Sequence, residues 1–60
     1  MKECIYVVED DENIREIIDL ALTSAGYNVK QFSNALDALK SMENDQVDLA
    51  VFGSCLFINF

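Results

Sequence analysis

Positions 4–13 read CIYVVEDDEN, a run of five apolar residues followed at once by four acids and an amide. An apolar run this short, rich in β-branched residues, is typical of a strand that is buried on both faces. The acids stand where a helix should begin, because carboxylates complement the positive end of a helix dipole, and Asp11 is the expected N-cap. The stretch therefore predicts a strand that passes directly into a helix.

The helical pattern continues from Asn13 to Gly26. Apolar residues at three- and four-residue spacing predict a buried face made of Ile14, Ile17, Ile18, Ala21 and Ala25, with Leu22 at its edge. The other side of this helix carries Arg15, Glu16, Asp19 and Thr23. Gly26 is expected to end the helix, because glycine adopts the left-handed conformation after a last turn without steric cost.

A second strand and a second helix are expected next. Residues 27–32 predict the strand. Its two faces would carry Val29 with Gln31, and Lys30 with Phe32. Ser33 or Asn34 is the expected cap of the helix that follows. The buried face expected for that helix comprises Ala35, Leu36, Leu39 and Met42.

A third apolar strand follows the polar connection at 43–46. It begins at Val47 or Asp48 and covers the apolar residues 49–52. The order of elements is therefore β-α-β-α-β. Crossovers this short predict an α/β fold in which the strands are parallel and the connections right-handed.

The composition excludes several classes of function. Sixty residues make one small domain or a piece of one. A net charge of −7 repels phosphate backbones, so we expect no binding to nucleic acid. The chain has no histidine, and histidine is the commonest general base. No apolar run has the length of a signal-peptide core or a membrane span, and Cys4 and Cys55 suggest reduced thiols, so a cytoplasmic location is expected.

The residues with potential chemistry are Glu9, Asp10 and Asp11, at the carboxyl end of the first strand. Ligands of open α/β sheets bind outside this end of the strands. Neighbouring carboxylates repel one another, and a hard divalent cation such as Mg²⁺ is the usual partner of oxygen-only ligands. The simpler interpretation is that the acids cap the helix and remain solvated, and for an arbitrary run of acids it is the more frequent one.

Four segments carry a resemblance to a known family. The run 5–16, the helix end 25–27 and the segments 33–39 and 48–51 resemble, in order and without gaps, receiver domains of bacterial two-component response regulators. The resemblance covers residues 3–52, about the first half of such a domain. It implies a truncated flavodoxin-like (CheY-like) fold with a parallel half-sheet of order 2-1-3.

The resemblance also implies roles for the acids. Asp10 would contact Mg²⁺ directly and Glu9 would do so through water, whereas Asp11 follows the family's acidic pair and is better interpreted as a cap. In the family, an aspartate at the end of the third strand accepts a phosphoryl group from the histidine of a sensor kinase. The metal neutralises charge on that phosphoryl group.

The chain departs from the family at the acceptor position, which is Gly53. Glycine supplies neither a nucleophile nor a third carboxylate, so no catalytic residue is expected, and Glu9 and Asp10 would form a vestigial site with weak or absent Mg²⁺ binding. Ser54 would face the opposite side of the strand and is a poor substitute. Residues 53–60 form a divergent apolar tail without charge. With the family's last two strands absent, the third strand would be an exposed edge, and self-association through this strand and the tail is expected.

The sequence thus predicts a non-enzymatic, truncated receiver domain of a phosphorelay that does not accept phosphate and does not pair productively with a histidine kinase. One alternative is a small interaction module that docks on an intact regulator or sensor kinase through its first helix, where Arg15 would matter. Another is an unrelated α/β protein that binds a metal through its carboxylates.

Overall fold

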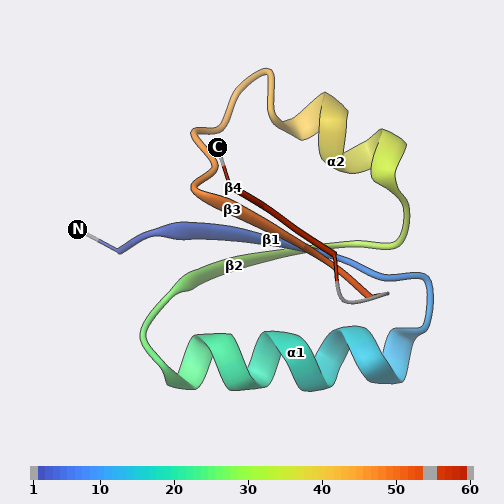
Figure 1. Ribbon diagram of the computed structural model, residues 1–60, viewed down its shortest axis with the longest axis vertical. Coiled ribbons are helices and arrows are strands. Elements are labelled where there is room, and N and C mark those ends of the chain that lie inside the picture. The colour runs from blue at the N-terminus through green and yellow to red at the C-terminus, as the bar shows by residue number, and fades with distance from the viewer. Residues whose placement is uncertain (1, 54–55, 60) are drawn as a thin grey trace.

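The computed structural model describes residues 2–53 and 56–59, and the chain forms one sheet with a helix on each face (Figure 1). The elements in chain order are β1 (Cys4–Val8), α1 (Glu12–Ser24), β2 (Asn28–Phe32), α2 (Ala35–Ser41), β3 (Leu49–Phe52) and β4 (Leu56–Asn59). Within the described ranges, no helix is long and apolar enough to cross a membrane.

The sheet has the order β2-β1-β3-β4. β1 lies in parallel between β2 and β3, with Val8 opposite Phe32 on one side and Phe52 on the other. The predicted parallel half-sheet of order 2-1-3 is therefore confirmed. Because the first three strands are parallel, their carboxyl ends meet at one edge of the sheet, where the acids follow β1.

The core lies on both faces of β1, as its apolar run predicts. Tyr6, Val8, Ala38 and Ala50 form a buried cluster on the α2 side, and the ring of Phe32 lies 4.6 Å from the ring of Tyr6. The side chains that alternate with these along the strands are also buried: Ile5, Val7 and Val51. Burial on both faces is why this strand needs no polar residue.

The predicted helix ends are confirmed. The Asp11 carboxylate caps α1 and accepts hydrogen bonds from the backbone N–H groups of Asn13 (2.9 Å) and Ile14 (3.1 Å). Gly26 follows the last turn with a φ of 100°, in the left-handed region that favours glycine. Asn34, one of the two expected caps, caps α2 by accepting a hydrogen bond from the N–H of Asp37.

The face of α1 that packs on the sheet differs from the predicted one. Ile18 and Leu22 are half-buried as expected, but so are Arg15 and Asp19, which were assigned to the solvent side. The exposed residues of the expected face are Ile14, Ile17, Ala21 and Ala25. The helix is turned because Arg15 donates hydrogen bonds to the backbone carbonyl of Glu9 and to the side chain of Gln31, and these bonds draw its polar side toward the sheet.

The predicted buried face of α2 is largely wrong. Ala38 is the buried residue of this helix, and Met42 is half-buried against the core. The exposed residues of the predicted face are Ala35, Leu36 and Leu39. A two-turn helix presents one narrow strip to a sheet, and the small side chain of Ala38 lets the backbone approach Tyr6 and Val8 closely.

The expected exposed edge at the third strand is also wrong. β4 pairs in an antiparallel manner with β3, so that Leu49 lies opposite Asn59 and Phe52 opposite Leu56. The hairpin provides partners for backbone N–H and C=O groups of β3 that an edge would leave unpaired. Residues 54, 55 and 60 of the predicted tail lie outside the described residues. β4 is now the edge strand.

Candidate functional site

The carboxyl ends of β1 and β3 bring Glu9 and Gly53 side by side. The N–H of Gly53 donates a hydrogen bond to the carbonyl of Val8 (3.0 Å), and the N–H of Glu9 donates one to the carbonyl of Phe32 (3.0 Å). These bonds extend the sheet pairing one residue beyond the strands. Residue 9 and residue 53 therefore lie side by side, as the family resemblance leads us to expect for the acidic pair and the acceptor position.

The side chain of Glu9 lies directly over Gly53. A Cβ atom placed on Gly53 would lie 1.8 Å from Oε1 and 2.6 Å from Oε2 of Glu9. The carboxylate therefore fills the space in which any side chain of residue 53 would begin. From the sequence, Gly53 indicates only that a side chain is missing at this position. The structure shows that the carboxylate of Glu9 occupies the space in which that side chain would begin.

Local hydrogen bonds hold this turn. Glu9 Oε2 accepts a hydrogen bond from the backbone N–H of Asp10 (3.0 Å). The backbone carbonyl of Glu9 accepts one from Nη1 of Arg15 (2.8 Å). Arg15 thus secures the connection between β1 and α1 from within the chain. It does not lie on the solvent-facing side of α1, where the sequence placed it.

The three acids do not converge. Glu9 is half-buried against Gly53, Asp10 is exposed, and the carboxylate of Asp11 is engaged by the first turn of α1. In the part of the chain that the structure describes, no three His, Cys, Asp or Glu side chains group closely enough to hold a metal ion. The side chains present thus do not fit the Mg²⁺ site that the family resemblance implies, since that site needs several oxygen ligands around one point.

A second polar cluster, which the sequence did not indicate, lies on the α2 side of the sheet. Oδ2 of Asp45 accepts hydrogen bonds from Tyr6 Oη (2.7 Å), Lys30 Nζ (2.7 Å) and Ser41 Oγ (2.9 Å). These bonds, led by the one from Lys30, lower the pKa of Asp45 from 3.8 to about 2. Burial raises the pKa of Tyr6. The tyrosine in an otherwise aliphatic run was the available signal, because a buried hydroxyl requires a partner.

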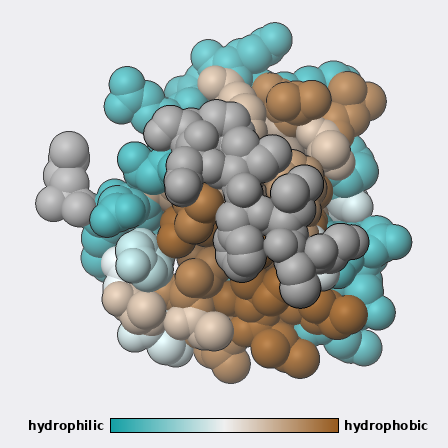
Figure 2. All heavy atoms as spheres, in the orientation of Figure 1, coloured by the Kyte–Doolittle hydropathy of each residue, from teal (hydrophilic) through white to brown (hydrophobic). Residues whose placement is uncertain are grey.

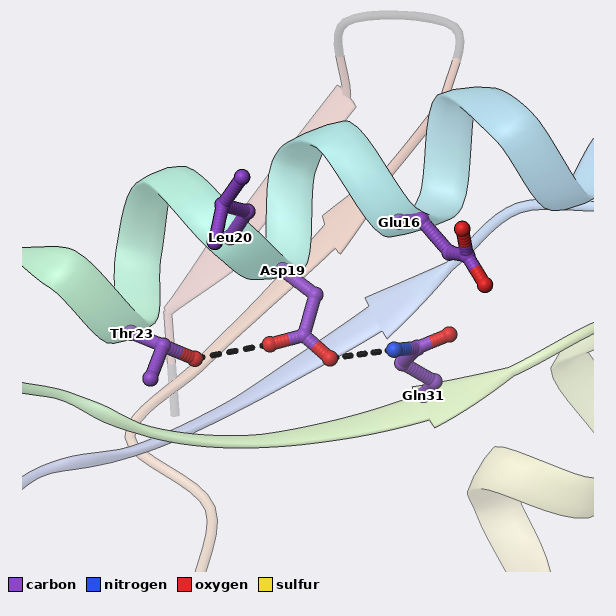
Figure 3. A pocket seen from close by; sticks show the side chains of 5 residues that line it. All are labelled: Glu16, Asp19, Leu20, Thr23 and Gln31. Carbon is purple, nitrogen blue, oxygen red and sulfur yellow. Dashed lines mark hydrogen bonds between the residues drawn. The ribbon is translucent and has the colours of Figure 1, made fainter.

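An open groove of about 380 Å³ lies between α1 and β2 (Figure 3). It is lined by Glu16, Asp19, Leu20, Thr23 and Gln31. Asp19 accepts hydrogen bonds from Thr23 Oγ1 (2.7 Å) and from Nε2 of Gln31. The bond from Gln31 joins α1 to β2, whereas the bond from Thr23 lies within α1.

Comparisons with known proteins place the chain among regulatory proteins of similar sequence. The chain is 43% identical over 47 residues to the uncharacterized transcriptional regulatory protein YrkP of Bacillus subtilis, a match that covers 78% of the chain and 20% of the relative. It is 36% identical over 45 residues to the DNA-binding transcriptional regulator NtrC of Proteus hauseri, covering 75% of the chain and 10% of the relative. The chain is also 29% identical over 51 residues to the regulatory protein VanR of Enterococcus faecium, and this match covers 85% of the chain and 22% of the relative.

The chain therefore spans between a tenth and about a fifth of the length of these curated relatives. No solved structure matches it significantly. The family model of the response regulator receiver domain matches residues 5–56, which include all three acids, Gly53 and the first residue of β4. This match removes the alternative of an unrelated α/β protein. The chain belongs to the response regulator receiver domain family.

Proposed function

We propose that this chain is a receiver unit of a two-component phosphorelay that does not accept a phosphoryl group. The observation that supports the proposal is Gly53, which stands at the carboxyl end of β3 beside Glu9, where the family has its acceptor aspartate. A phosphoryl group needs a nucleophilic oxygen, and glycine offers none. The unit would then have no enzymatic role, and an encounter with a sensor histidine kinase would not lead to transfer.

Weak or absent Mg²⁺ binding is part of the same proposal. Asp10 is exposed, but Glu9 is turned toward Gly53 and Asp11 is engaged as a helix cap. A single free carboxylate is a poor ligand set for a cation that prefers six oxygens in near-ideal geometry. The magnesium site of the family would be vestigial here.

Treatment with acetyl phosphate in the presence of Mg²⁺ tests the proposal directly. The intact mass of the chain should stay unchanged, while an active receiver domain treated in parallel should gain one phosphoryl group. A phosphoryl adduct on the chain that hydroxylamine removes would refute the proposal, because that lability identifies an acyl phosphate.

A specific surface favours a second candidate function, docking on an intact regulator or sensor kinase. Ile14, Ile17 and Leu20 follow one another along α1 with exposed fractions of 44%, 67% and 70%. Apolar side chains gather where α1 lies in the space-filling view (Figure 2). Exposed apolar side chains in a contiguous row mark interaction surfaces. Arg15 does not contribute to this candidate, because it is engaged within the chain.

The docking candidate is tested with Ile17→Asp in a binding titration against a full-length regulator or a sensor kinase. The variant should weaken binding at least about tenfold, since a charge would enter the centre of the interface. Leu36→Asp is the matched control, because Leu36 is 61% exposed on α2, on the other face of the sheet. Equal affinities of both variants and the unmodified chain would exclude docking through α1.

Other expectations remain predictions. The relatives are named as transcriptional regulators, one of them as DNA-binding. The chain matches only a small part of each relative. Its net charge of −7 opposes DNA binding by these 60 residues. A cytoplasmic location is likewise part of the proposal, supported by the family.

A further inference from the structure

We propose that Glu9 acts as a plug: its carboxylate lies over Gly53 and closes the carboxyl edge of the sheet, so that Glu9 and Gly53 form a mutually dependent pair. The plug rests on the proposed function in one respect, because it takes position 53 to be the family's acceptor position. It adds a physical reason for the inactivity of the site, which is that the remaining acid of β1 occupies the vacant space.

The backbone places the two residues so that the plug needs no distortion of the sheet. Glu9 and Gly53 each donate their N–H to the neighbouring strand at 3.0 Å, and the last paired residues, Val8 and Phe52, lie opposite each other. Residues 9 and 53 therefore stay adjacent whatever their side chains do. The space above Gly53 belongs to this edge of the sheet, and the carboxylate of Glu9 lies in it.

Three observations describe the position of the carboxylate. It lies within 1.8–2.6 Å of where a Cβ of residue 53 would be. It accepts a hydrogen bond from the N–H of Asp10 at 3.0 Å. Glu9 as a whole residue is half-buried, whereas the neighbouring Asp10 is exposed. The two acids thus point into different surroundings, which relieves the repulsion between adjacent carboxylates.

The plug and a side chain at position 53 exclude each other. Even the single methyl group of alanine would require the Glu9 carboxylate to leave, and this costs little because the displaced atoms are the far end of a flexible side chain. With glycine at 53, the Glu9 carboxylate is turned inward and unavailable to a cation. With aspartate at 53, Glu9 would be forced outward beside Asp10, and three carboxylates would face solvent together.

Nuclear Overhauser effects measured at one fixed pH test the plug in the unmodified chain. The Hγ protons of Glu9 should give cross-peaks to the Hα protons of Gly53, because the carboxylate lies over that residue. Gly53→Ala should weaken these contacts with residue 53, while the amides of Val8 and Val51 keep their positions and report an intact sheet. Cross-peaks that persist at full intensity in Gly53→Ala would overturn the plug. Their absence from the unmodified chain would also overturn it, so the question is decided even if substitution at 53 prevents folding.

Line broadening by Mn²⁺ provides the second measurement. Gly53→Asp should broaden the Asp10 amide at a Mn²⁺ concentration at least about tenfold lower than Gly53→Asn, which has the same shape without the charge. The unmodified chain should require a higher Mn²⁺ concentration than Gly53→Asn, because the asparagine side chain also displaces Glu9 and frees its carboxylate beside Asp10. Equal Mn²⁺ sensitivity of the unmodified chain and Gly53→Asn would overturn the plug, because it would mean that Glu9 is available to a cation regardless of residue 53. Phosphorylation of the unmodified chain would refute the proposed function alone, so the two failures are distinguishable.

Discussion

At the scale of single residues, Asp45 connects parts of the chain that are distant in sequence. One of its oxygens accepts hydrogen bonds from Tyr6 on β1, Lys30 on β2 and Ser41 at the end of α2. The aromatic ring of Tyr6 is fully buried, so its hydroxyl requires an acceptor at the edge of the core. Asp45 provides that acceptor and fixes the connection between α2 and β3 against the sheet.

Acid should weaken the fold through this residue. Its pKa is lowered from 3.8 to about 2 by the bonds from Lys30, Tyr6 and Ser41, so the ionised form stabilises the folded state. This stabilisation is complete above pH 3.8 and is lost as the pH falls through about 2. We expect the urea midpoint to drop across this window, and to drop less in Asp45→Asn, which should be less stable at neutral pH. Glu43→Gln, at an exposed acid nearby, should retain the full acid response; identical pH profiles for all three chains would contradict this assignment.

At the scale of elements, the two helices are attached to the sheet in different ways. α1 is capped by Asp11 and bonded to the sheet through Arg15 and Asp19, whereas α2 is short and rests on Ala38. Neither helix buries a wide apolar strip. The cap and the polar bonds to β2 therefore add to the packing of the half-buried Ile18 and Leu22 in holding α1 in place.

Loss of the α1 cap should be measurable. Asp11→Ala removes the acceptor of the Asn13 and Ile14 N–H groups and should lower the free energy of unfolding by about 1 kcal/mol. Chemical denaturation measures the loss, and faster hydrogen exchange at Asn13 and Ile14 would locate it. Asp11→Ser, which retains a capping oxygen, should lose much less. A loss of equal size in both variants would mean that the negative charge of Asp11 is required, beyond its geometry as a cap.

At the scale of the whole molecule, β4 ends the sheet on one side. Its four residues, Leu56–Asn59, carry no charge, and an uncharged edge strand offers unpaired backbone groups to another strand. The net charge of −7 opposes association of two copies. Salt screens that repulsion over a Debye length of about 8 Å at physiological ionic strength.

Self-association should therefore increase with both protein concentration and salt. Sedimentation velocity should show a monomer at low ionic strength and larger species as salt is added. Phe57→Lys should suppress the larger species, because a lysine on an edge strand opposes pairing with a second copy. Glu43→Gln changes the net charge by the same one unit outside β4 and is the control, which should leave association unsuppressed; if it suppresses association as strongly as Phe57→Lys, the β4 edge does not control the process.

Much of this architecture follows from local sequence. Three features are set by residues that are close together in the sequence, and the sequence predicts each of them correctly. They are the strand β1, the cap of α1 at Asp11 and the left-handed conformation of Gly26. The position of Gly53 beside the acids also follows from sequence. Parallel strands of nearly equal length bring their carboxyl ends to the same edge, so residues 9 and 53 had to meet once the order 2-1-3 was assigned.

Other features were decided by tertiary structure alone. The rotation of α1 depends on Arg15 reaching a backbone carbonyl and a side chain on another strand, and helical periodicity contains no information on such bonds. The pairing of β4 with β3 was not predicted, although only the antiparallel direction is open to two neighbouring strands that three residues connect. The Asp45 cluster joins residues up to 39 positions apart. The plug likewise depends on the conformation of the Glu9 side chain. That conformation is possible only after β1 and β3 have paired and brought Gly53 beside Glu9.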